Sequence, residues 1–152
     1  MRSSTLAKLA AFIVAAGAMY YLTARGTPPP TSASASAAPP PVPVPANQQE
    51  PLTMFVKFKA CEPTNCDQVA CDKFSDGQSA DGVAHLATCR WTDRSRGESP
   101  RRCAYAHYVE QPGKPTLGAL FLSTPSAGEV CERDQAFNDL LKNDVGYTGR
   151  LP

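Results

Sequence analysis

The segments VAHLATCRW (residues 83–91) and RRCAYAHYV (residues 101–109) decide the fold of this chain. Both are rich in β-branched, aromatic and small residues, a composition typical of strands. The polar segment 92–100 between them contains one glycine and one proline. We therefore predict two antiparallel strands that are joined by a loop at residues 92–100.

The cysteines and histidines of these strands indicate a register. If Cys89 lies opposite Cys103, then His85 lies opposite His107, and all four share one face because side chains alternate with a period of two. The Cα atoms of directly opposite residues at a non-hydrogen-bonded position are close enough for a disulfide. The sequence therefore predicts a disulfide between Cys89 and Cys103.

Further strands are predicted on either side of this hairpin. Apolar and polar residues alternate over residues 52–59, which predicts a half-buried strand. An apolar strand is predicted at residues 117–123, after a Pro112–Gly113 turn. The dipeptides Asp76–Gly77 and Asp81–Gly82 predict turns.

Two helices complete the predicted elements. Asn65 would cap one or two helical turns that end at Phe74, and Ser126 would cap a helix over residues 127–142. The inward stripe of the second helix would be Val130, Phe137, Leu140 and Leu141. The order β-α-β-β-β-α predicts an α+β domain at residues 52–152, with a mainly antiparallel sheet and one or two helices on one face.

The remaining cysteines predict further disulfides. Cys61, Cys66, Cys71 and Cys131 are left if Cys89 bonds to Cys103, and Cys131 would then tie the last helix to the Cys-rich stretch. Which of the other three it takes stays open. The spacing lacks the Cys-x-x-Cys pairs of zinc and thioredoxin-like redox sites, so we predict a disulfide-stapled domain without a cofactor.

An apolar segment at residues 9–25 follows a basic N-terminus at residues 1–8. One interpretation is an uncleaved transmembrane signal-anchor with a cytoplasmic N-terminus, which the paired Tyr20 and Tyr21 favour as boundary residues. The other is a signal peptide that is cleaved after Ala18, because the segment is short for a membrane span. We favour the anchor.

Residues 26–51 form a stretch of proline, alanine and serine. Proline fixes φ and lacks a backbone donor, so a disordered or polyproline II stalk is predicted here. We interpret it as a spacer rather than as a proline-rich ligand.

The charge of the chain argues against one class of partner. There are 15 basic and 14 acidic residues, which gives a formal net charge of +1. A nucleic-acid-binding protein needs a basic field to neutralise phosphates, so no nucleic-acid partner is predicted.

The two histidines, His85 and His107, are candidate metal ligands if the predicted register holds. Glu110 or Asp81 would be a third ligand near one end of the hairpin. The competing interpretation, which we favour, is that both imidazoles fill space on a mixed strand face.

The hairpin loop concentrates positive charge. Arg94, Arg96, Arg101 and Arg102 lie in or beside it, close in sequence to Trp91. Guanidinium groups beside a tryptophan are typical of a surface that binds an anionic partner. The competing interpretation is a solvated loop with Trp91 largely buried.

These features predict location and a general function. A tethered, disulfide-rich domain belongs outside a membrane, and the absence of any Asn-x-Ser/Thr acceptor fits a bacterial periplasm. We expect a single-pass inner-membrane protein, or a periplasmic one if the signal is cleaved. Its function would be that of an interaction module, an accessory part of an envelope assembly. A small envelope hydrolase, or an inhibitor of an envelope enzyme, is the alternative.

Overall fold

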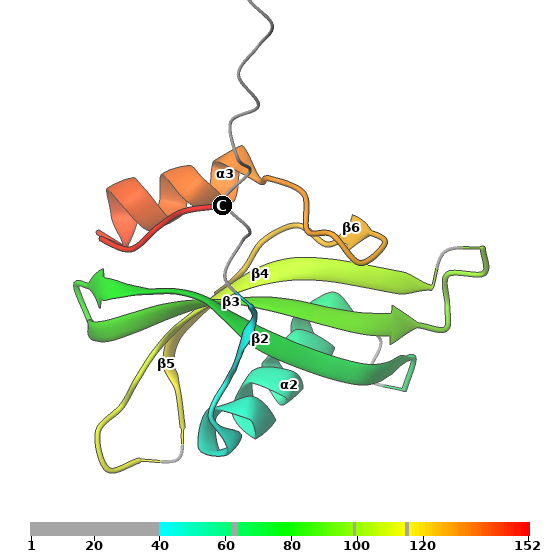
Figure 1. Ribbon diagram of the computed structural model, residues 1–152, viewed down its shortest axis with the longest axis horizontal. Coiled ribbons are helices and arrows are strands. Elements are labelled where there is room, and N and C mark those ends of the chain that lie inside the picture. The colour runs from blue at the N-terminus through cyan, green and yellow to red at the C-terminus, as the bar shows by residue number, and fades with distance from the viewer. Residues whose placement is uncertain (1–39, 62–63, 99, 115) are drawn as a thin grey trace, which may run out of the picture. The chain divides into compact units, whose positions relative to one another are not determined.

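A computed structural model describes residues 40–152, except for residues 62–63, 99 and 115 (Figure 1). The predicted cytoplasmic N-terminus, the membrane segment at residues 9–25 and most of the predicted stalk lie outside the described residues. Residues 40–152 form one compact unit, so residues 40–51 belong to the folded domain and not to the stalk. Within the described part of the chain, no helix has both the length and the apolar character to cross a membrane.

An antiparallel sheet forms the centre of the described domain. Its strands are β1 (Val42–Pro43), β2 (Cys66–Ser79), β3 (Gly82–Asp93), β4 (Arg101–Val109), β5 (Gly118–Leu122) and β6 (Ser126–Ala127). The order across the sheet is β1-β2-β3-β4-β5, and β6 also pairs with β4. The helices are α2 (Ala46–Ala60) and α3 (Gln135–Asp139), and a π-helical turn, η1 (Leu140–Asp144), continues α3. The predicted α+β class with a mainly antiparallel sheet is confirmed.

The central hairpin forms as predicted, but its register differs by one residue. Cys89 pairs with Ala104, and Cys103 pairs with Arg90. Because side chains alternate with a period of two, a shift of one residue places Cys89 and Cys103 on opposite faces of the sheet. The predicted Cys89–Cys103 disulfide is therefore wrong.

All six cysteines of the chain are paired, and they staple the sheet in three places. The disulfides are Cys61–Cys66, Cys71–Cys89 and Cys103–Cys131. Cys71 on β2 lies opposite Cys89 on β3, with 4.1 Å between their Cα atoms. Cys131 is tied to β4 and not to the Cys-rich stretch, so that expectation is also wrong.

Helices cover both faces of the sheet, which corrects the expectation of one face. Figure 1 shows α2 on one side of the sheet and α3 on the other. Trp91 and Tyr108 are fully buried in the cluster of side chains that includes Leu52 of α2. On the other face, Leu86 packs in the cluster that includes Phe137 and Leu141.

Residues 52–59, predicted to be a strand, form most of α2. Leu52 and Val56 are fully buried, whereas Met54 is 65% and Phe58 is 76% exposed. Residues four apart lie on one face of a helix and also on one face of a strand. The spacing of Leu52 and Val56 therefore fits both structures. Pro51 obscured the helix in the sequence, because proline normally disfavours helix interiors.

The predicted helix through Phe74 is also wrong, because these residues belong to the long strand β2. Gly77 lies inside this strand and not in a turn. A Cβ atom at Gly77 would lie 2.6 Å from the backbone nitrogen of Gly149, so glycine is needed there for the close approach of the C-terminal segment. The Asp81–Gly82 turn is confirmed, with a φ of 130° at Gly82.

The last helix begins at Gln135, later than predicted. The N-cap is Asp134, whose side chain accepts a hydrogen bond from the backbone N–H of Phe137 (3.1 Å). Ser126 pairs with Cys103 in the sheet instead of capping a helix. Phe137 and Leu141 are buried as predicted, whereas Val130 is 79% exposed.

Removal of different disulfides should lower the stability of the domain by different amounts. Cys71→Ala with Cys89→Ala should lower the free energy of unfolding by about 3 kcal/mol, because this bond constrains an 18-residue separation in the unfolded chain. Cys61→Ala with Cys66→Ala spans only 5 residues and should cost about 2 kcal/mol. Urea denaturation of both variants measures the difference. An equal or larger loss for the Cys61–Cys66 pair would contradict this ranking.

Candidate functional site

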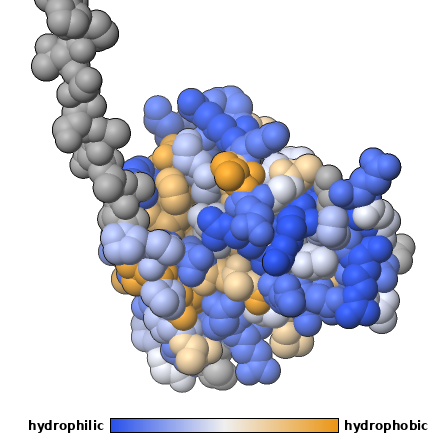
Figure 2. Space-filling model, turned by 45° about the vertical axis from the view of Figure 1, so that its right-hand side comes forward, coloured by the Kyte–Doolittle hydropathy of each residue, from blue (hydrophilic) through white to orange (hydrophobic). Residues whose placement is uncertain are grey.

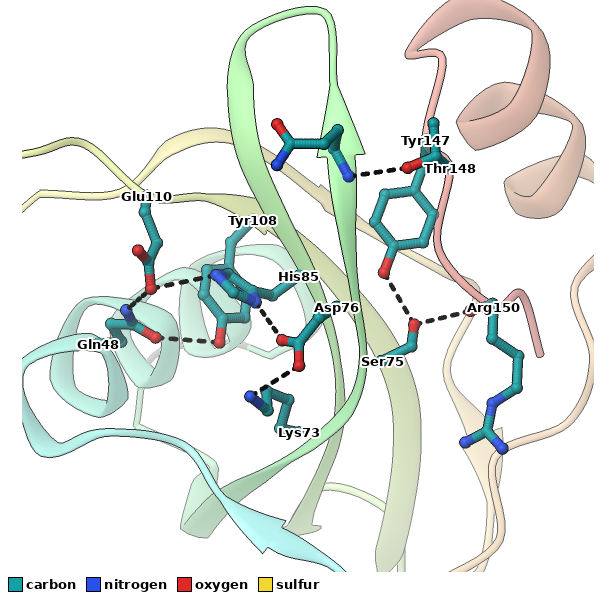
Figure 3. Close-up of polar contacts among 11 residues, drawn as sticks. Gln48, Lys73, Ser75, Asp76, His85, Tyr108, Glu110, Tyr147, Thr148 and Arg150 are labelled. Atoms are coloured by element: carbon teal, nitrogen blue, oxygen red, sulfur yellow. Dashed lines mark hydrogen bonds and ion pairs between the residues drawn. The ribbon is translucent and has the colours of Figure 1, made fainter.

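The imidazole of His85 lies between two carboxylates (Figure 3). Its Nδ1 atom is 2.6 Å from Oδ1 of Asp76, and its Nε2 atom is 3.1 Å from Oε1 of Glu110. The Nε2 contact has the distance of an ion pair but not the direction of a good hydrogen bond. Since both ring nitrogens face carboxylates, neither is directed at a hydroxyl group that it would activate as a base.

Lysine and glutamine side chains extend this cluster. Lys73 Nζ lies 2.9 Å from Oδ2 of Asp76, and hydrogen bonding from Lys73 lowers the pKa of that carboxyl. Gln48 of α2 donates a hydrogen bond to Glu110 (2.5 Å) and accepts one from the hydroxyl of Tyr108 (3.1 Å).

The buried hydroxyl in this cluster stays protonated, because burial raises the pKa of Tyr108. The cluster joins α2 to strands β2 and β3 and to the end of β4. Its hydrogen bonds and ion pairs therefore form a polar brace that holds α2 against the sheet.

Sequence reasoning missed most of this cluster. It considered His85 and Glu110, but it took Asp76 for a turn residue and Gln48 for part of the stalk. The residues come from four separate elements, and no local pattern links them. A hollow of about 460 Å³ beside the cluster is lined by Asn47, Gln48, residues 110–114 and Leu117, and neither histidine lines it.

His107 lies on the opposite face of the sheet from His85. It is fully buried, its Nδ1 atom is 3.0 Å from the carbonyl oxygen of Ala119, and its ring packs against Phe121 and Tyr147. Burial lowers the pKa of His107, so the ring is neutral and Nδ1 donates to the carbonyl.

The register therefore separates the two histidines that were considered as candidate metal ligands and places their rings on opposite faces of the sheet. Among the described residues, no group of three or more His, Cys, Asp or Glu side chains is placed to hold a metal ion.

The structure changes the composition of the binding surface that was considered at the hairpin loop, which comprised Trp91 and four arginines. Trp91 is fully buried in the core, as the competing interpretation expected, and so it is no part of an exposed tip. The end of the molecule that carries the β3–β4 loop is turned toward the viewer in Figure 2 and is mainly hydrophilic.

Each of the four arginines has a partner within the domain. Arg94 pairs with Asp67, Arg96 with Asp93 at 3.7 Å, and Arg101 with Glu129 at 3.4 Å, while Arg102 donates a hydrogen bond to the carbonyl of Pro125. Because these partners offset the charge locally, the loop offers less positive field than its sequence indicates. Recognition of an anionic partner by this loop stays a prediction.

A second surface was not predicted. A groove of about 410 Å³ is lined by Phe55, Lys59, Leu120, Phe121, Leu122, Ser123, Thr124, Pro125 and Leu140. These residues come from α2, from strand β5 with the segment after it, and from η1. The groove is open to solvent and combines apolar side chains with Ser123, Thr124 and Lys59, and Lys59 is its one charged lining residue in the described part of the chain. Sequence reasoning missed it because Phe55 and Lys59 were assigned to a strand.

Comparison with protein-family models, with curated proteins and with solved structures finds no match for this chain.

The burial of His107 predicts a pH dependence of stability. In the unfolded chain an imidazole protonates near pH 6.5, whereas in the folded domain burial keeps His107 neutral to lower pH. The unfolded state then binds more protons, so the stability that is present above pH 6.5 is lost as the pH falls through the folded pKa. Urea denaturation between about pH 7 and about pH 5 measures this loss.

His107→Asn should weaken this dependence, because asparagine retains a donor for the carbonyl of Ala119 but does not titrate. His85→Asn is the matched control and should retain the contribution of His107. An unchanged slope in His107→Asn would mean that another group causes the dependence.

Proposed function

We propose that this chain is a membrane-tethered interaction module of the bacterial cell envelope, and that its domain at residues 40–152 binds another envelope protein. The observation that carries the proposal is the groove between α2 and β5. Its lining includes Phe55, Leu120 and Leu122, all of them partly exposed. Apolar surface that is concave and open to solvent is typical of a binding site for a partner.

The exposed side of α2 supports the same conclusion. Phe58 is 76% and Met54 is 65% exposed, and both belong to the helix that forms one wall of the groove. Large apolar side chains that stay in water cost free energy unless a partner covers them, and aromatic residues are enriched at the centres of interfaces.

The sequence and the disulfides support an extracytoplasmic location. All six cysteines form disulfides, which persist in oxidising compartments and are rare in the cytosol. The apolar segment at residues 9–25 would supply export and the tether. The alternative of an envelope hydrolase gains no support from His85, whose two nitrogens both face carboxylates.

The location predicts the redox state of the isolated protein. An exported chain should react with a thiol-alkylating reagent only after reduction, because its disulfides close in the periplasm. Mass spectrometry after alkylation in lysed cells measures this, with a variant that lacks residues 1–25 as the control for cytosolic thiols. Several labelled cysteines in the full-length chain would contradict export.

The interaction predicts site-specific cross-linking. A photoreactive amino acid at position 124, in the lining of the groove, should form adducts with another envelope protein in cells that express the chain naturally. The same amino acid at position 81, in the exposed turn between β2 and β3, is the control. Equal adducts from both positions, or none from position 124, would count against the groove as the binding surface.

A further inference from the structure

The two edges of the sheet differ in how they are protected. On the β2 edge, the side-chain amide of Gln49 bonds to the N–H and C=O groups of Cys71 when its oxygen and nitrogen are oriented to satisfy both. Strand β1 then covers Asp72 and Lys73.

The C-terminal segment covers this edge from Phe74 to Gln78. The N–H of Thr148 donates to the carbonyl of Gln78 (3.0 Å), and the hydroxyl of Thr148 accepts from the N–H of Gln78 (3.0 Å). Arg150 donates to the carbonyl of Phe74 (3.1 Å). Proteins commonly cover sheet edges in this way to prevent unwanted strand pairing.

Strand β5 forms the opposite edge and has no such cover within the described residues. It consists of the apolar residues Gly118–Leu122, without the charged residues or prolines that usually block an edge. All five residues are partly exposed. The positive φ of Ala119 lies at an irregularity in the ladder with β4, and the regular pairs that follow it are those of Phe121 and Leu122.

The backbone groups of Leu122 point to this open edge. Ser123 N–H donates to the carbonyl of Tyr105 (2.9 Å), and Tyr105 N–H donates to Oγ of Ser123 (2.8 Å), so these two residues are bonded directly across the strands. Bonded and non-bonded pairs alternate, so the next pair, Ala106 and Leu122, is non-bonded. The N–H and C=O groups of Leu122 therefore point away from β4.

The groove follows the same edge and has walls on both faces of the sheet. Leu120 and Leu122 belong to the α2 side, where Phe55 and Lys59 line the groove. Phe121 belongs to the other side, where Leu140 of η1 lines it. An extended chain beside β5 would place alternate side chains against these two walls.

We propose that the partner binds by strand addition: an extended segment of another protein pairs antiparallel with Leu120–Leu122 and places an acidic side chain near Lys59. This inference rests on the proposed interaction function and names the chemistry of its partner. Lys59 makes no ion pair with any described residue and lies 5.8 Å from the centre of the Phe58 ring. It is therefore free to pair with a carboxylate from the partner.

Charge also disfavours a second copy of this chain as the occupant. In a twofold pairing of β5 with β5, the two copies of α2 would lie on the same face of the continuous sheet. Both Lys59 side chains would then lie on that face beside the paired strands, where like charges repel. A heterologous acidic strand avoids this repulsion.

The probe for this proposal is a peptide of about seven residues in which valine alternates with threonine and the central threonine is replaced by glutamate. Fluorescence anisotropy measures its binding to the full-length chain in detergent, and amide hydrogen exchange reports on Leu122. We expect binding, with slower exchange at this amide. A peptide with lysine in place of glutamate should bind at least about tenfold more weakly.

Two variants at one position separate backbone pairing from side-chain contact. Leu122→Pro removes the outward N–H and places a ring at the edge, whereas Leu122→Ala shortens the side chain but keeps the N–H. Leu122→Pro should weaken binding at least about tenfold relative to Leu122→Ala. Equal affinities of the two variants would overturn strand addition.

A surface variant tests the charge without risk to the fold. Lys59→Glu should reverse the preference between the two peptides, and an unchanged preference would overturn the assignment of an acidic partner. If the chain dimerises in a concentration-dependent way and Leu122→Pro abolishes the dimer, the proposed acidic partner is overturned and a second copy of the chain is the occupant. If cross-linking from position 124 captures a partner while the peptide does not bind, the interaction function stands and strand addition fails.

Discussion

The pairing of β3 with β4 is the constraint on which the rest of the domain depends. With Arg90 opposite Cys103, Cys89 and Trp91 lie on the α2 face, and Cys103 lies on the α3 face. The two disulfides of this hairpin follow from that division, one to β2 and one to the segment before α3. A slip of one residue would move every side chain of one strand to the wrong layer, so the covalent staples and the buried tryptophan reinforce the same register.

The same register gives the two histidines different surroundings. His85 meets two carboxylates at the edge of the α2 layer, and Gln48 of α2 bonds to one of them, Glu110, so these polar contacts hold the helix against the sheet. His107 meets a carbonyl and two aromatic rings in the α3 layer and is neutral there. One residue type on neighbouring strands therefore serves as a polar brace on one face and as a core residue on the other.

Protection of one sheet edge and exposure of the other link the fold to the proposed function. The β2 edge is covered between Cys71 and Gln78 by Gln49, by β1 and by the C-terminal segment. The β5 edge combines apolar side chains with outward backbone groups beside a groove.

Local patterns in the sequence determined the hairpin at residues 83–109, the strand at residues 117–123, the burial of Trp91, Phe137 and Leu141, and the α+β class. Alternation of side chains and turn residues act between near neighbours, so a sequence reveals them directly. Only the tertiary structure decided that residues 52–59 form a helix, because Leu52 and Val56 fit either period and the sheet face above them selects the helix. It also decided the disulfide partners, the separation of His85 from His107, and the groove at β5, since each depends on a register or a contact between distant segments.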